Sequence, residues 1–218
     1  MCSKRNLIIR LRRVVLLIKA LHMNAAVPIA VLNIAFPFLL LLIYHSKGMC
    51  EELTITANRL YGLFFPPMIC WCPIFVQKFY FEEAGCELLF INGSRNKTAD
   101  LLWIFCFGIS LELLLLTPVC FFVYGFLRYC LRLLLVTIFY FGTTYLISFL
   151  AHSITPTLLF TVVYTVMNLF SPGQTVHFPF YYSPESQPDI LKCELPLSAI
   201  GVTAVAVTSF LMSKRKSI

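Results

Sequence analysis

Charged residues are scarce in this sequence. They make up 12% of the 218 residues, against 59% hydrophobic residues and a mean hydropathy of +0.84, whereas about a quarter of the residues of an ordinary soluble domain are charged. A water-soluble core has no use for that much apolar surface, but lipid does. The composition therefore excludes a soluble domain and predicts an all-α integral membrane protein, organised as a single transmembrane domain over residues 1–218.

Motifs for ATP binding and for metal chemistry are also lacking. No phosphate-binding loop of the form GxxxxGK[ST] occurs, so any ATP hydrolysis is expected on a partner chain. Cys70 and Cys72 form a CxC without a second ligand pair. Glu82 and Glu83 are adjacent, as in membrane proteases with paired glutamates, but the next charge is Glu87 and no His pair has ligand spacing. We expect no enzyme, no metal site and no cofactor of its own.

Acidic residues are fewer than basic ones, and the formal net charge is +7. Twelve of the 17 Lys and Arg lie in three stretches, residues 4–19, 78–97 and 214–216. Basic residues near the ends of membrane spans mark the cytoplasmic side, and this explains the three stretches better than nucleic-acid binding does. The predicted location is the plasma membrane, with both termini in the cytoplasm. Arg128 and Arg132 fall on the opposite side of this arrangement.

Long apolar runs recur along the chain, and each is close to the roughly 20 residues that a spanning helix needs. Prolines occur within the first two runs and predict kinked helices packed inside the bundle. A basic amphipathic stretch, residues 7–21, precedes the first run and is expected either as an interfacial helix or as a solvated arm. The six predicted spans are residues 24–44, 60–79, 101–124, 133–150, 157–170 and 195–212.

The polar segment between the second and third spans has a defined pattern. It reads FEEAGCELLFINGSRNKTAD, with an acidic patch, a glycine, Glu-Leu-Leu and then Ser-Arg and a further basic residue. This order resembles the cytoplasmic segment of the permease subunits of type 2 ABC exporters. Cys86 stands where that family commonly has Thr, and Asn92 and Gly93 replace its usual Pro. The residues that carry the resemblance or join it are Glu82, Glu83, Gly85, Glu87, Leu88, Leu89, Ser94, Arg95 and Lys97.

The resemblance implies a coupling helix between the second and third spans that docks onto a separate cytoplasmic ABC ATPase, with ATP and Mg²⁺ on that partner. It also implies a homodimer, or a heterodimer with a sister permease, that exports a hydrophobic or amphipathic substrate such as a lipid, peptide or drug. Two alternatives remain open at this point. The segment is a solvated loop, or the chain is a stand-alone membrane immunity or binding protein without transport.

Glu112 lies in the middle of the third predicted span. An ionisable group at that depth costs at least about 2.5 to 3.5 kcal/mol on insertion scales, so it usually faces a cavity or a partner. Glu112 is therefore a candidate for the translocation path, or a neutral, hydrogen-bonded residue of the bundle. Arg128, 16 positions on, reaches it only if the helix bends. Asn33, His152 and Asn168 are expected to link helices by hydrogen bonds.

Two further patterns concern the parts outside the spans. Asn92 and Asn96 begin glycosylation sequons, but the predicted topology places both in the cytoplasm, where no glycan is added. Cys50 and Cys193 are both expected outside, so a disulfide between them is one option. The aromatic, proline-rich stretch 177–184 is typical of a membrane interface.

Overall fold

The computed structural model describes residues 12, 14–21, 24, 26–48, 51–82, 97–117, 119, 126–170 and 190–215. Within these ranges the regular structure is entirely helical. The principal helices in chain order are α2 (Ala26–Ala30), the π-helix η2 (Val31–Ala35), α3 (Phe36–Lys47), α4 (Glu51–Phe81), α6 (Lys97–Leu115), α8 (Phe126–Ala151), α9 (Thr155–Phe170) and α10 (Ile190–Arg215).

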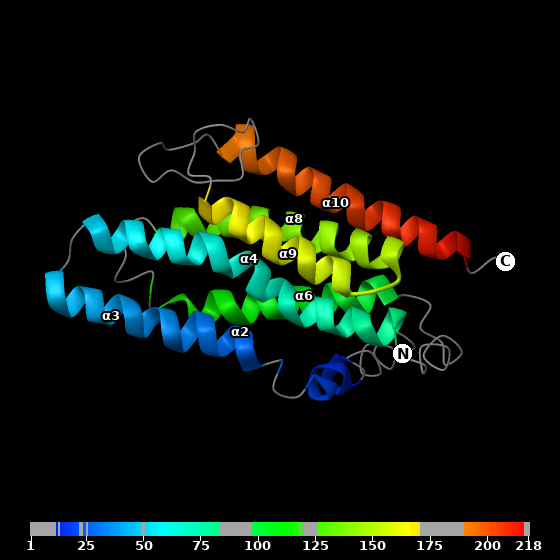
Figure 1. The fold of residues 1–218 in the computed structure, drawn as a ribbon, viewed down its shortest axis with the longest axis horizontal. Helices are drawn as coiled ribbons and strands as arrows, with labels where there is room; N and C mark the ends of the chain where they lie inside the picture. Colours follow the sequence, from blue (N-terminus) through cyan, green and yellow to red (C-terminus); the bar gives the residue numbers. More distant parts are fainter. Residues whose placement is uncertain are drawn as a thin grey trace, which may run out of the picture.

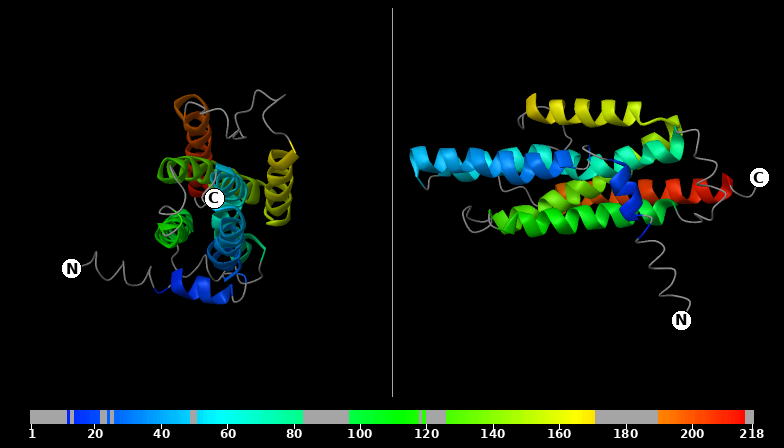
Figure 2. Two further views of the ribbon diagram at one scale, coloured as in Figure 1. Left: turned by 90° about the vertical axis from the view of Figure 1, so that its left-hand side faces the viewer. Right: turned by 90° about the horizontal axis from the view of Figure 1, so that it is seen from below.

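The helices lie roughly alongside one another in an elongated bundle (Figure 1). α4 contacts α3, α6, α8 and α9, and α10 packs along α8. Seen end-on, α4 lies among these neighbours, and α9 and α10 lie toward the periphery (Figure 2). α4 is therefore the central helix of the described bundle.

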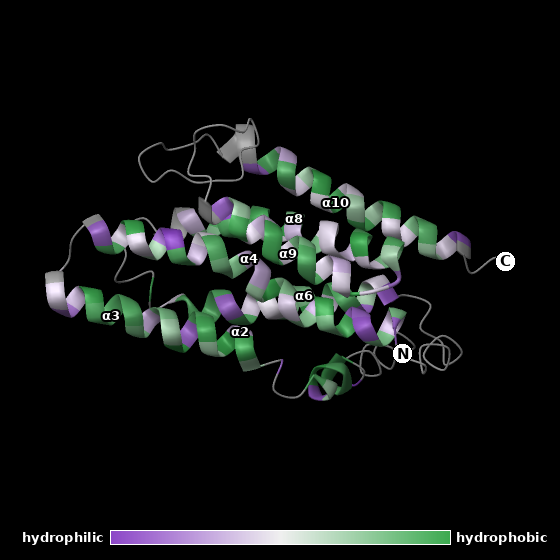
Figure 3. Cartoon of the chain, viewed as in Figure 1, coloured by the Kyte–Doolittle hydropathy of each residue, from purple (hydrophilic) through white to green (hydrophobic). Residues whose placement is uncertain are grey.

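Hydrophobic residues cover most of the helical length (Figure 3). Among the described residues, five helical segments are long and apolar enough to cross a membrane, one fewer than the six predicted spans: Ala26–Ser46, Glu52–Phe81, Lys97–Leu115, Tyr129–Ala151 and Glu194–Lys214. The predicted fifth span corresponds to α9, which has only 16 residues. At 1.5 Å per residue it is about 24 Å long, shorter than the roughly 30 Å hydrocarbon core. A sixth span therefore does not follow from length and composition.

Several helices extend beyond the predicted spans. α4 begins at Glu51 and includes Arg59, so both charges lie on the helix. The predicted second span began only at residue 60, which had left these charges in a connecting segment. α8 begins at Phe126, which places Arg128 and Arg132 on the helix rather than before it. A hydropathy window locates only the apolar part of a helix, whereas backbone hydrogen bonds carry the helix into its charged ends.

The prolines have different effects in the first two spans. α4 continues through Pro66, Pro67 and Pro73, and 56% of the residues in its apolar window are buried. In the first span the α-helix gives way to η2 between Pro28 and Pro37. Only 17% of the residues in that apolar window are buried. The prediction of packing inside the bundle is confirmed for α4 and is wrong for most of α2–α3.

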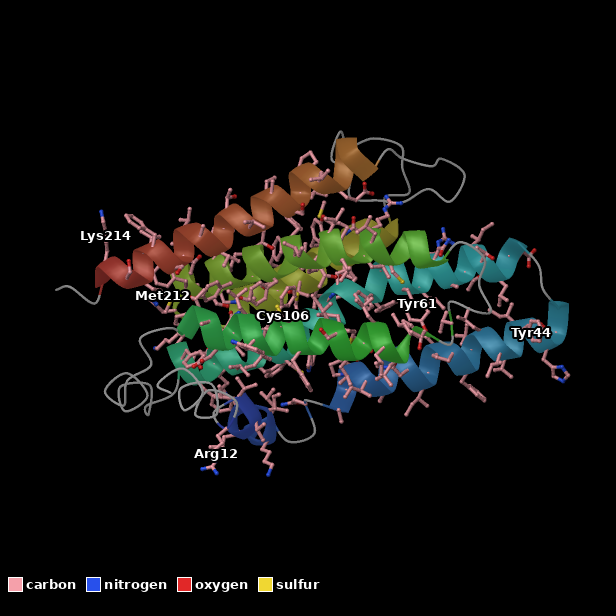
Figure 4. The ribbon with its side chains drawn as sticks, turned by 180° about the vertical axis from the view of Figure 1, so that it is seen from behind. Arg12, Tyr44, Tyr61, Cys106, Met212 and Lys214 are labelled. Carbon is pink, nitrogen blue, oxygen red and sulfur yellow. The ribbon has the colours of Figure 1, made fainter. Side chains whose placement is uncertain are left out.

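The bundle has two ends that carry different charged residues. Arg12 and Lys214 lie toward one end, and Tyr44 lies toward the other (Figure 4). The first of these ends also carries Glu82 and Lys97, which terminate α4 and begin α6. We call it the Lys97 end and the opposite one the Tyr44 end. Residues 14–20 are helical at the Lys97 end and bury Val14 and Leu17. Their place at a membrane surface stays a prediction.

Candidate functional site

The segment that resembles a coupling helix lies mostly outside the described residues. Residues 83–96, and with them Glu83, Gly85, Glu87, Leu88, Leu89, Ser94 and Arg95, are not described. The sequons at Asn92 and Asn96 lie in the same range. The structure does place the two residues that flank the segment, Glu82 and Lys97, at one end of the bundle.

Glu82 fixes the turn between α8 and α9. Its Oε1 atom accepts hydrogen bonds from the Ser153 hydroxyl and the Ile154 backbone N–H, both at 2.6 Å. Ser153 Oγ in turn accepts a bond of 3.2 Å from the backbone N–H of Thr155, the first residue of α9. A carboxylate is favourable there because the N-terminus of a helix exposes unpaired N–H groups. The bond from Ser153 lowers the pKa of Glu82 below its ordinary value.

Lys97 is buried with 2% of its surface exposed, and its ammonium lies 5.1 Å from the centre of the Tyr80 ring. This geometry is a cation–π contact between α6 and the last turns of α4. Next to it, the Thr98 and Tyr145 hydroxyls share a hydrogen bond of 2.8 Å, and Tyr145 donates to Met212 Sδ at 3.0 Å. The Lys97 end is thus tied together by polar contacts from α4, α6, α8 and α10.

Glu112 is buried with 3% exposed, as its position in an apolar run predicted. Its partner is Asn33 of η2, whose Nδ2 donates to Glu112 Oε2 at 2.6 Å. Arg128 had been the partner considered from sequence, but its side chain lies outside the described set. The expected linking role of Asn33 is confirmed. Asn168 lies on α9, and its expected linking role stays a prediction.

A buried pair of opposite charges was missed by the sequence analysis. Arg132 Nε of α8 lies 2.5 Å from Glu194 Oε1 of α10, and both side chains are buried. The sequence did contain a signal for this pair, because Arg132 and Glu194 have opposite charges and each directly precedes a predicted span. The pair neutralises Arg132 near the starts of α8 and α10, away from the basic residues of the Lys97 end. This removes much of the conflict that Arg132 posed for the predicted charge arrangement.

Among the described residues, no group of three or more His, Cys, Asp or Glu side chains is arranged to hold a metal ion. Cys70, Cys72, Cys106 and Cys130 form no disulfide among the described residues. The proposed pair of Cys50 and Cys193 lies outside the described side chains.

The described residues thus form a helical bundle in which five helices could span a membrane. No family model, no curated protein and no solved structure matches the chain.

Proposed function

We propose that this chain is the transmembrane permease subunit of an ATP-binding-cassette exporter. The ATPase would be a separate cytoplasmic chain that supplies ATP and Mg²⁺, and the permease would act as a homodimer or with a sister permease. Its cargo would be a hydrophobic or amphipathic molecule moved outward across the plasma membrane. The sequence supports this through the pattern from Glu82 to Lys97 and through its lack of a nucleotide-binding motif.

The observation that carries the proposal is the way the motif is attached to the bundle. Residues 83–96 connect the end of α4 directly to the start of α6. At the first of these junctions Glu82 is hydrogen-bonded to the α8–α9 turn. A force applied to the segment would therefore reach α4, α6, α8 and α9 together. A coupling element needs such a mechanical connection, whereas a solvated loop does not.

The proposal includes six membrane crossings, with α9 as the fifth. α9 contacts α8 and α4 and runs back alongside them (Figures 1 and 2). A short helix crosses where the bilayer thins locally or where flanking residues reach the interface. With six crossings both termini lie on one side. The basic residues of the Lys97 end would make that side the cytoplasm.

The test is co-purification of the tagged chain from native membranes in mild detergent. We expect an ABC ATPase to accompany the natural sequence and to be lost when Glu83 and Glu87 are both changed to Lys. The matched control changes Glu51 and Glu52 to Lys, which alters charge equally but at the opposite end of the bundle.

Loss of the ATPase from both double variants would point to general damage and not to a docking site in residues 83–96. An ATPase-free natural protein would contradict the permease assignment and favour a stand-alone immunity or binding protein.

A further inference from the structure

The contact between Glu112 and Asn33 lies deep in the apolar part of the bundle. Glu112 is within electrostatic range of Tyr61 and Cys72 of α4. These two residues stand on either side of the middle of α4 (Glu51–Phe81). The carboxyl group is thus level with the middle of α4, where it is buried and hydrogen-bonded to Asn33. No cationic side chain of the described residues stabilises its charge.

The irregular backbone of η2 explains how Asn33 is positioned. The Phe36 N–H bonds the carbonyl of Val31, five residues earlier, and the same pattern would pair the Leu32 carbonyl with residue 37. Residue 37 is proline and has no N–H. The Tyr61 hydroxyl donates to the Leu32 carbonyl instead, at 3.1 Å. Short π-helical segments often occur at functional sites, and this one presents Asn33 to Glu112.

A carboxamide is suited to both protonation states of a carboxyl group. Its Nδ2 donates to an ionised carboxylate, as seen, and its Oδ1 accepts from a neutral carboxylic acid once the amide rotates. Asn33 Oδ1 is buried and has no hydrogen-bond partner among the described residues. The acceptor that a protonated Glu112 requires is therefore present and unused. The ion pair of Glu194 with Arg132 differs, because a cation stabilises only the charged form.

We propose that Glu112 and Asn33 form a proton-exchange site inside the membrane, in which the carboxyl group gains and loses a proton while the Asn33 amide turns to match. The ligand is a proton taken from water and returned to it, with no other reactant. This inference does not rest on an ATPase partner or on a transported substrate.

Infrared difference spectroscopy of the full chain in lipid vesicles tests the site directly. Lowering the pH should produce a carboxylic-acid C=O band that is absent from Glu112→Gln, whose amide keeps a hydrogen bond to Asn33. In Asn33→Leu the band should shift in frequency, since the neutral acid loses its acceptor. The matched control is Asn168→Leu, which removes an amide of α9 and not of the η2–α6 contact, and it should leave the band unchanged.

A second measurement requires no variant to fold. A hydrophobic carbodiimide reacts with protonated carboxyl groups in the bilayer, and mass spectrometry measures the adduct on Glu112 of the natural chain. Above its midpoint, a one-proton site should lose labelling about tenfold per pH unit. A band and an adduct that do not vary with pH would overturn the proposal in favour of a fixed structural contact. Loss of both on adding Na⁺ at constant pH would assign the site to a metal cation instead.

Discussion

At the scale of single residues, Glu82 is the carboxylate whose role the structure changes most. The sequence pattern places it in an ATPase-docking surface, but one of its oxygens accepts two hydrogen bonds from the α8–α9 turn. Glu82 therefore acts first as an anchor for the start of α9. In the proposed function, the residues that dock onto the ATPase are therefore those after Glu82, in the segment 83–96.

This anchor should depend on pH. The pKa of Glu82 is lowered in the folded chain, chiefly by the bond from Ser153, so the ionised form stabilises the fold. That stabilisation is complete above the ordinary glutamate pKa and is lost as the pH falls through the lowered value. We expect Glu82→Gln to reduce stability at neutral pH by on the order of 0.5 kcal/mol, because the side chain is largely exposed to solvent screening.

The measurement is thermal unfolding in detergent from about pH 8 to about pH 3, where the difference between Glu82→Gln and the natural chain should vanish at the acidic limit. Ser153→Ala should reduce the same difference by removing one of the two donors. A constant difference at all pH values would mean that the carboxylate charge is not what holds the turn.

Sequence reasoning found the buried carboxylate but not its partner. A lone Glu112 in an apolar run predicts burial and a hydrogen bond, since an unpaired charge in lipid is costly. Asn33 becomes the partner of Glu112 because η2 positions it there. The sequence around the prolines does not show where a π-helical turn forms, so this partner could not be predicted. The Glu82–Ser153 contact spans 71 positions, and neither residue carries a local signal of the other.

At the scale of helices, the closest contact is between the backbones of α8 and α10. A Cβ atom added to Gly142 would meet the carbonyl oxygen of Gly201, and one added to Gly201 would lie 2.5 Å from the Ile138 oxygen. Ser198 and Thr208 are buried on the same helix, α10. Small residues of this kind let membrane helices approach closely enough for dispersion and weak hydrogen bonds to hold them.

We therefore expect Gly142→Ala to destabilise the bundle by about 1 to 3 kcal/mol, because backbone and not a movable side chain occupies the space. The control is Gly108→Ala on α6, where an added Cβ meets nothing within 4 Å. That change should be neutral or stabilising by up to about 1 kcal/mol, through helix propensity. Unfolding in a denaturing detergent series measures both, and equal effects would exclude a close α8–α10 contact as the cause.

The existence of the helices was more predictable than their ends. Hydropathy located the apolar part of α2–α3, α4, α6, α8 and α10 because lipid requires it. Glu51 and Arg59 were assigned to a connecting segment because a charge lowers the hydropathy of a window, yet a charge at a helix end can reach water or a partner. The buried pair of Arg132 and Glu194 shows the second case.

At the scale of the whole molecule, the charges divide between the two ends. Arg12 and Lys214 lie toward the Lys97 end (Figure 4), while Arg132, near the start of α8, is paired with Glu194. Lys and Arg residues near the ends of spans bias the orientation toward having that side in the cytoplasm. The Lys97 end is therefore the end that we expect in the cytoplasm.

Epitope tags test this orientation. A tag inserted at Gly48, in the α3–α4 connection, should be reached by antibody on intact cells, and a tag after residue 218 only after permeabilisation. A third tag between α9 and α10 reports on α9, and its exposure on intact cells would establish that the 16-residue helix crosses. Exposure of the C-terminal tag together with protection of the Gly48 tag would reverse the orientation, whereas exposure of both would mean that α9 does not cross.

The glycine contact also sets an order of events during synthesis. α8 leaves the ribosome well before α10, because N-terminal segments emerge first. During that interval lipid chains must occupy the groove at Gly142, and the carboxylate that will neutralise Arg132 has not yet been made. The bundle is therefore most vulnerable to quality-control proteases just before its last helix enters the membrane, when a basic side chain and an open groove are exposed together.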